Sequence, residues 1–103
     1  MGVPVVTMLG KSFQARVAAS LVAAAGVPEL AAGSFDDYRA MALSLAGDTE
    51  RLAVIRGHLT SNRDRLPLFD IGRYTKHIEA AFNEMWTIHR QGDAPRAFAV
   101  SDD

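Results

Sequence analysis

Residues 3–12, Val-Pro-Val-Val-Thr-Met-Leu-Gly-Lys-Ser, decide the fold class of this 103-residue chain. Val3 to Met8 is an almost continuous apolar run rich in β-branched residues, which is typical of a strand buried on both faces of a parallel sheet. The turn Gly10 to Ser12 follows it and leads into a helical pattern. Strand, glycine turn and helix form half of a βαβ unit, so the sequence predicts an α/β fold.

Four helices are expected after this strand. The first carries apolar residues at steps of four from Phe13 and ends at Gly26, just before Pro28. The other three follow residues that can cap a helix N-terminus: Ser34, Asp48 and Asp70. The expected content is one or two short strands and about four helices, so the chain is α/β by type but mostly helical.

The strand at Val3 to Met8 lacks neighbours in the chain itself. A strand of a parallel sheet needs partners for its backbone N–H and C=O groups, and the only other candidate is the weak segment Leu30-Ala31-Ala32. The missing partners are expected to come from the remainder of a parent domain or from a second copy of the chain, which would make a homodimer.

The last helix is predicted to be the longest. Its apolar residues are spaced by three and four: Ile71, Tyr74, Ile78, Ala81, Met85 and Ile88, with Phe82 and Trp86 widening the band. This spacing favours packing against other polypeptide over a ligand groove. Gly92 and Pro95 end the helix, so residues 1–92 are predicted to form the folded part and residues 93–103 a flexible tail.

Composition excludes several classes of function. The formal net charge is −1 with scattered Lys and Arg, which argues against binding to nucleic acid or to a membrane surface. There is no cysteine, so disulfides and thiolate metal sites are excluded. The N-terminus lacks the basic region of a signal peptide and the longest apolar run is too short to span a bilayer, which makes the cytoplasm the default location.

The turn Gly10-Lys11-Ser12 is the one candidate binding site. Backbone N–H groups at a helix N-terminus and one lysine can hold an anion, and ligands of open α/β sheets gather at this edge. A nucleotide-triphosphate loop is not supported, because Val5 stands where that motif needs its first glycine. The turn is therefore expected either to be a plain helix cap or to border a pocket for an anion or a sugar nucleotide.

Catalytic and metal-binding residues are not expected in this chain. The histidines, His58, His77 and His89, have no partner at a metal-binding spacing and are expected at the surface or its boundary. No serine lies in a Gly-x-Ser-x-Gly nucleophile turn.

The order of short motifs closely resembles the C-terminal end of the catalytic domain in the protein O-GlcNAc transferase and SPINDLY family. The resemblance rests first on Gly2-Val-Pro-Val-Val-Thr-Met8, Gly10-Lys-Ser-Phe13 and Arg16-Val-Ala-Ala-Ser20. Further matches follow in order: Gly26-Val-Pro-Glu-Leu30, Asp37-Tyr38, Leu45-Ala46, Asp48, Arg51-Leu52, Asn62-Arg63, Pro67-Leu-Phe-Asp70, Tyr74 and Met85-Trp86. Leu9 departs from the family, which often has proline there.

The resemblance implies a segment of the C-terminal Rossmann-like lobe of a GT-B glycosyltransferase, a fold usually found behind tetratricopeptide repeats. Such enzymes move N-acetylglucosamine from UDP-GlcNAc to Ser or Thr of proteins without a metal cofactor, and SPINDLY-type relatives use a fucosyl donor. The family's donor-binding His-Thr-Thr segment precedes the part seen here, so the chain is expected to support the donor lobe and to be inactive alone. Gly10, Lys11, Ser12 and Arg16 would then lie near the donor phosphates.

A second interpretation belongs to a different class of function. The chain would be a self-standing helical module that dimerises through its Val3 to Met8 strands and buries the Trp86 face of its last helix.

Overall fold

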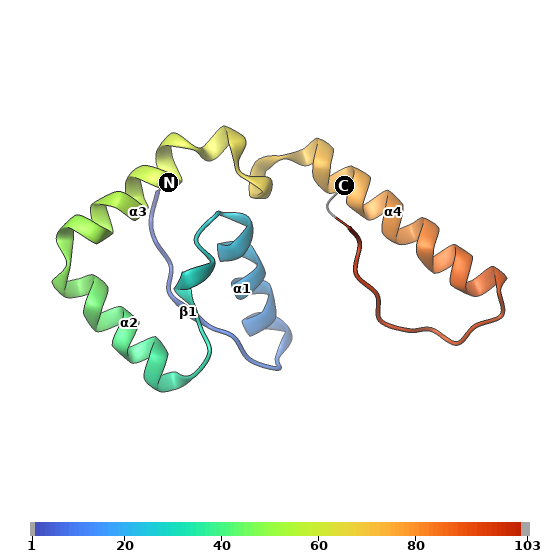
Figure 1. The fold of residues 1–103 in the computed structure, drawn as a ribbon, viewed down its shortest axis with the longest axis horizontal. Coiled ribbons are helices and arrows are strands. Elements are labelled where there is room, and N and C mark those ends of the chain that lie inside the picture. The colour runs from blue at the N-terminus through green and yellow to red at the C-terminus, as the bar shows by residue number, and fades with distance from the viewer. Residues whose placement is uncertain (1, 102–103) are drawn as a thin grey trace. The chain divides into compact units, whose positions relative to one another are not determined.

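The computed structural model describes residues 2–101 and separates into two compact units, Met1–Phe69 and Asp70–Asp103 (Figure 1). Its elements are, in order, β1 (Thr7–Met8), α1 (Phe13–Ala24), the 3-10 turn η1 (Pro28–Leu30), β2 (Ala31–Ala32), α2 (Phe35–Gly47), α3 (Thr49–Ser61), the 3-10 turns η2 (Arg63–Arg65) and η3 (Pro67–Phe69), and α4 (Ile71–Arg90). The described chain is mostly helical, with four helices and two short strands, as the sequence predicts.

The two strands of the first unit pair in parallel. Thr7 lies opposite Ala31 and Met8 opposite Ala32, and the backbone N–H of Leu9 donates to the carbonyl oxygen of Ala32 at 2.8 Å. The predicted second strand is thus confirmed at its last two residues. The first strand is shorter than the predicted Val3 to Met8, because β2 has only two residues with which β1 can pair. Val3 to Val6 lie opposite no strand in the described chain.

Local side-chain caps explain why the helix starts agree with the sequence. In all four helices the cap oxygen accepts a hydrogen bond from the backbone N–H three residues later: Ser12 from Ala15, Ser34 from Asp37, Asp48 from Arg51 and Asp70 from Arg73. The end of α1 is set by Gly26, whose φ of +76° lies in the left-handed region that glycine adopts readily.

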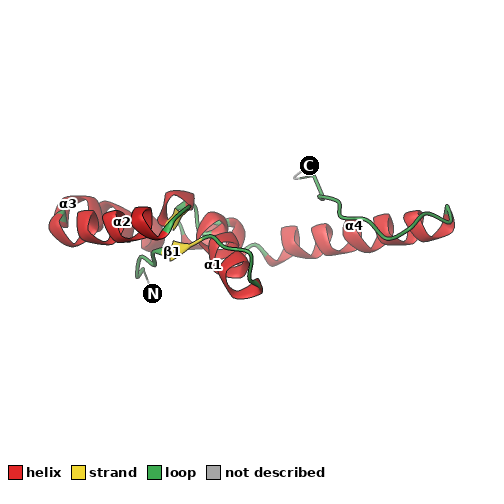
Figure 2. Cartoon of the chain, turned by 90° about the horizontal axis from the view of Figure 1, so that it is seen from below, coloured by secondary structure: helices red, strands yellow, loops and turns green. Residues whose placement is uncertain are grey.

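The core of the first unit is centred on Leu30, which is 0% exposed. It packs with four other buried residues, contributed by α1, the turn after it, α2 and α3: Val22, Val27, Leu45 and Ile55. Two views place the strand pair between α1 and the α2–α3 hairpin (Figures 1 and 2). Leu30 thus joins every helix of this unit through one cluster.

Two aromatic residues that begin helices are exposed, including Phe13, which starts the apolar stripe predicted for the first helix. Phe13 begins α1 and is 79% exposed, and Phe35 begins α2 and is also exposed. Both start the helix that follows a strand, so they lie at the carboxyl edge of the strand pair. The stripe predicted for α1 at steps of four from Phe13 is wrong at Val17 and Leu21, which are also exposed, because Val22 is the α1 residue that packs in the core. In α2 the inner residue Leu45 is buried.

Gly57 lies inside α3, where a Cβ would meet no atom within 4 Å. Alanine has a higher helix propensity because it lowers the backbone entropy of the unfolded chain. We expect Gly57→Ala to raise the free energy of unfolding of the first unit by about 0.5–1 kcal/mol. Urea unfolding followed by circular dichroism measures this change, and an unaltered midpoint would contradict it.

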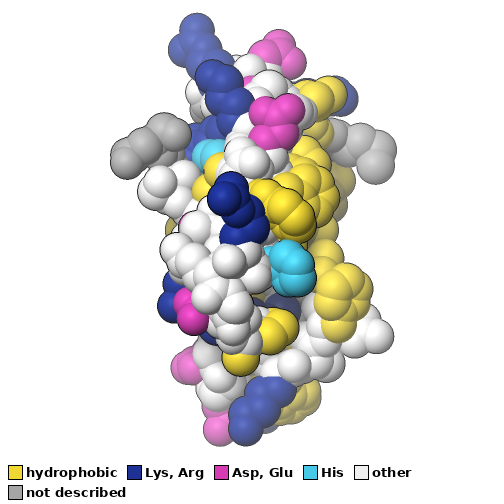
Figure 3. All heavy atoms as spheres, turned by 90° about the vertical axis from the view of Figure 1, so that its right-hand side faces the viewer, with side chains coloured by type: hydrophobic (Ala, Val, Ile, Leu, Met, Phe, Trp, Pro, Cys, Tyr) yellow, Lys and Arg dark blue, Asp and Glu magenta, His cyan; other side chains and the backbone are white. Residues whose placement is uncertain are grey.

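The second unit consists of α4 and the segment after it. Six large apolar side chains on one broad face of α4 are 36–78% exposed, and we call them the apolar stripe: Ile71, Tyr74, Ile78, Phe82, Met85 and Trp86. Figure 3 shows one face of the surface, on which apolar side chains gather mainly along one side. A stripe of this size is typical of a face that packs against other polypeptide.

Candidate functional site

The candidate site is the turn that joins β1 to α1. Because β1 and β2 are parallel, their carboxyl ends meet at one edge, so the turn after β1 and the turn at Gly33 and Ser34 lie at the same end of the pair. The Leu9–Ala32 hydrogen bond fixes the start of the first turn against β2.

Three of the predicted site residues, Gly10, Lys11 and Ser12, lie in this turn, and the fourth, Arg16, lies near the start of α1. A Cβ on Gly10 would come within 3.3 Å of the Ala15 Cβ, so the close approach of turn and helix favours glycine. The Ser12 hydroxyl accepts from Ala15 N at 3.3 Å, and the Ser12 carbonyl accepts from Arg16 N at 3.1 Å. Ser12 is thus engaged in capping α1, and its hydroxyl shapes the turn.

Lys11 and Arg16 are both exposed and line the same shallow surface hollow of about 570 Å³. Phe13, Val17 and Ser20 complete its lining, while Gly10 and Ser12 are not among the lining residues. Two cationic side chains beside a helix N-terminus favour an anionic group. Within residues 2–101, the turn therefore has the chemistry to bind an anion but offers no side chain arranged as a nucleophile with a base.

Sequence reasoning missed an apolar hollow of about 380 Å³ in the first unit. Its lining comes from four separate segments: Gly2, Val3 and Val5; Ala18, Leu21, Val22, Ala25 and Val27; Leu59; and Leu66, Leu68 and Phe69. No local spacing connects such distant residues, so only the tertiary structure reveals the hollow.

His58 is the other polar feature of this unit. It is half-buried, and its Nδ1 lies 3.3 Å from Asn62 Nδ2, which is the local hydrogen bonding expected of a boundary histidine. Its Nε2 is buried without a hydrogen-bond partner and lies against Gly26. The ring therefore packs on the end of α1, and the histidine is a structural contact between α3 and α1.

The described residues contain no group of three or more His, Cys, Asp or Glu side chains placed to hold a metal ion. In that same part of the chain, no helix combines the length and the apolar character that crossing a membrane requires.

A parallel strand, a glycine turn and a capped helix define an α/β segment, with the cationic side chains of Lys11 and Arg16 beside the turn. The model of glycosyl transferase family 41 matches residues 1–78, and the chain belongs to this family.

Known relatives match almost all of the chain. The probable UDP-N-acetylglucosamine–peptide N-acetylglucosaminyltransferase SEC of Arabidopsis thaliana is 34% identical over 100 residues, which are 96% of this chain and 10% of the relative. The SPINDLY protein of Oryza sativa subsp. japonica, with the same activity in its name, is 37% identical over 95 residues, 92% of this chain and 10% of the relative. The UDP-N-acetylglucosamine–peptide N-acetylglucosaminyltransferase of Caenorhabditis elegans is 36% identical over 91 residues, 88% of this chain and 8% of the relative. The chain thus spans about a tenth of the length of these relatives.

Proposed function

We propose that this chain is the C-terminal part of the donor-binding lobe of a GT-B protein O-glycosyltransferase, which transfers a sugar from UDP-GlcNAc to Ser or Thr of proteins. Residues 1–92 would form the lobe segment and residues 93–103 the tail. The chain would support the lobe, and would be inactive alone because it holds no complete donor site. The cytoplasm is the expected location.

The observation that carries this proposal is the family match combined with the open sheet. A pair of two-residue parallel strands is far shorter than a stable sheet, and parallel sheets are normally covered on both faces. Val3 and Val5, which precede β1, are more than half exposed although their side chains are suited to a core. The remainder of a parent catalytic domain would cover this segment, and the apolar stripe of α4 would pack against the same polypeptide.

The donor would meet this chain at the turn of Gly10, Lys11, Ser12 and Arg16. UDP carries a diphosphate, and Lys11 and Arg16 are the two cations that line the hollow at the start of α1. The exposed Phe13 ring lies in the same hollow and is available for stacking on a base or a sugar. No metal is needed for this role, because the two cations and the helix N-terminus supply the positive charge.

We expect UDP in the millimolar range to shift the backbone NMR signals of residues 10–16 in the intact chain. Lys11→Ala should weaken these shifts, because it removes one of the two cations, whereas Arg39→Ala should not, because Arg39 is an exposed residue of α2 outside the hollow. An unchanged spectrum on adding UDP, or equal weakening of the shifts by both variants, would contradict the proposal that the donor binds at this turn.

The chain alone should show no glycosyl transfer. Incubation with radiolabelled UDP-GlcNAc and an acceptor peptide should give no labelled peptide above the level without protein. Measurable transfer by the 103-residue chain would contradict the proposal that it is only the supporting segment.

The second candidate function is a self-standing module that forms a homodimer, and the exposed apolar stripe of α4 favours it. Light scattering during size-exclusion chromatography distinguishes this dimeric module from the lobe segment. A tight dimer at micromolar concentration would favour the module, and a monomer would favour the lobe segment.

A further inference from the structure

Two long faces of α4 differ in their exposure. Beside the exposed apolar stripe runs a row of four residues, His77, Ala81, Glu84 and Ile88, which are half-buried or, in Ile88, only 5% exposed. Steps of four, three and four place these residues on one line along the helix. A covering element therefore lies over this row and leaves the stripe open.

That element is the segment after α4, which runs back alongside the helix (Figures 1 and 2). Gly92, with a φ of +75°, allows the chain to reverse, and the backbone N–H of Asp93 donates to the carbonyl oxygen of Ile88 at 3.2 Å. Pro95 and Arg96 then line a hollow together with Ile88. The reversal thus brings residues 93–96 onto the last turns of α4.

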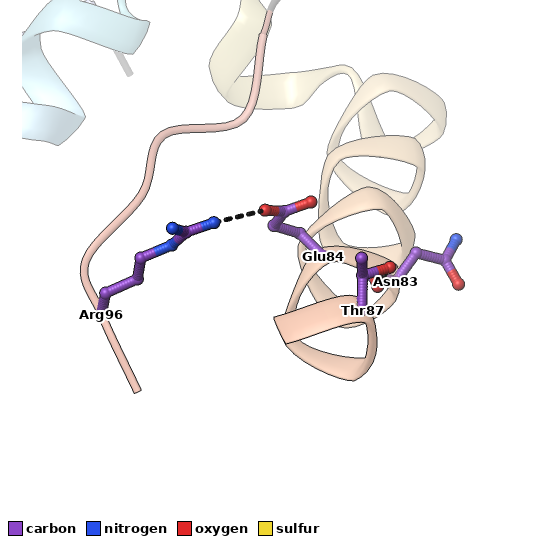
Figure 4. Close-up of polar contacts among 4 residues, drawn as sticks. All are labelled: Asn83, Glu84, Thr87 and Arg96. Carbon is purple, nitrogen blue, oxygen red and sulfur yellow. Dashed lines mark hydrogen bonds and ion pairs between the residues drawn. The ribbon is translucent and has the colours of Figure 1, made fainter. Parts of the chain in front are cut away.

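Beyond the reversal, alternate residues of the segment face the helix. Arg96 Nη2 lies 3.8 Å from Glu84 Oε1 (Figure 4), and Phe98 and Val100 are half-buried, whereas Ala97 and Ala99 are exposed. Alternation of this kind is expected of an extended segment with one side against a surface.

We propose that residues 93–100 form a strap that holds α4 in its helical form, seals the row from His77 to Ile88, and restricts any partner of α4 to the apolar stripe. An isolated helix of this length gains little stability from propensity alone, so the tertiary contacts of the strap matter. This role needs neither a donor nor a parent domain, and it stands apart from the proposed function.

The contacts of the strap are individually weak. The Arg96 and Glu84 side chains are 58% and 44% exposed, and exposed ion pairs contribute little to stability. The closed state of the strap is consequently sensitive to single substitutions in the contacts that hold it.

Amide hydrogen exchange, followed by NMR on the intact chain, tests the strap. Arg96→Glu places two like charges together and should accelerate exchange of Asp93 and of the amides from Met85 to Arg90 by about two- to fivefold. Phe98→Asp removes the half-buried ring and should accelerate the same amides by about tenfold. Exchange in α1, which belongs to the other unit, should not change.

Two further variants complete the test. Lys76→Glu makes the same change of charge on α4 outside the strap contacts, so it should leave the exchange rates of the Met85 to Arg90 amides unchanged. The charge-swapped chain, Glu84→Arg with Arg96→Glu, should return exchange toward the natural rate. The strap is wrong if the natural Asp93 amide exchanges like an unstructured peptide, if Arg96→Glu and Phe98→Asp change nothing, or if α1 accelerates equally.

Discussion

Leu30→Ala is expected to lower the free energy of unfolding of the first unit by about 2–5 kcal/mol. Leu30 is fully buried in the core cluster to which α1, α2 and α3 all contribute. Truncation to alanine therefore leaves a cavity among side chains of several elements, which relax only partly into it. A unit of this size has a total stability of about 3–10 kcal/mol. Urea unfolding followed by far-ultraviolet circular dichroism should show an early or absent transition.

Leu43→Ala provides the matched control. Leu43 lies in α2 but is 64% exposed, so the same chemical change removes little buried surface and should alter stability by less than about 0.5 kcal/mol. Equal unfolding midpoints for the two variants would show that Leu30 is not at the centre of a packed core.

Gly26→Ala should destabilise the first unit by about 2–4 kcal/mol, through two effects. Alanine is strained at the left-handed φ of Gly26, and its Cβ would lie 2.7 Å from His58 Nε2 and 3.1 Å from Leu66 Cδ2. The imidazole would have to move out of its buried place at the end of α1. Thermal unfolding measures the sum of the two effects.

A double-mutant cycle separates strain from the clash. In a His58→Ala chain the ring is absent, and Gly26→Ala should then cost about 1–2 kcal/mol, close to the backbone strain alone. Gly92 has a φ of +75° and no atom within 4 Å of an added Cβ, so Gly92→Ala tests backbone strain without a clash. This strain should accelerate amide exchange at the end of α4. An identical cost of Gly26→Ala with and without His58 would contradict the packing of the ring on Gly26.

The sequence predicts the helices well because their limits are encoded locally. Ser34, Asp48 and Asp70 each cap the helix that follows, and Gly26 ends α1 with a conformation that other residues adopt with strain. These signals act within three or four residues, so no knowledge of the tertiary structure is needed to place them.

Strand length and burial are less predictable because both depend on distant partners. The apolar run at Val3 to Met8 is suited to a longer strand, yet only Thr7 and Met8 pair, since β2 has two residues. Phe13 and Phe35 follow apolar patterns and remain exposed for want of a covering element in the described chain. The contacts between residues 93–100 and the row on α4 were likewise not predicted, because the sequence indicates only a flexible tail after residue 92.

For the candidate site, the sequence located the turn but not its neighbourhood. The glycine, the cap and the strand before them single out residues 10–12, and the structure adds that Lys11, Phe13 and Arg16 share one hollow. The role of this hollow in donor binding remains a prediction.

The exchange rate of the Met8 amide most directly tests whether the chain is one side of a larger parallel sheet. Successive N–H groups of a strand point to opposite sides, and Leu9 N–H bonds to β2, so Met8 N–H points to the other edge. If that edge awaits further strands, Met8 should exchange at nearly the unprotected rate in the natural chain, about fivefold faster than Leu9. Protection of Met8 equal to that of Leu9 would show that the edge is already paired, and would contradict the proposal that the chain completes a larger lobe.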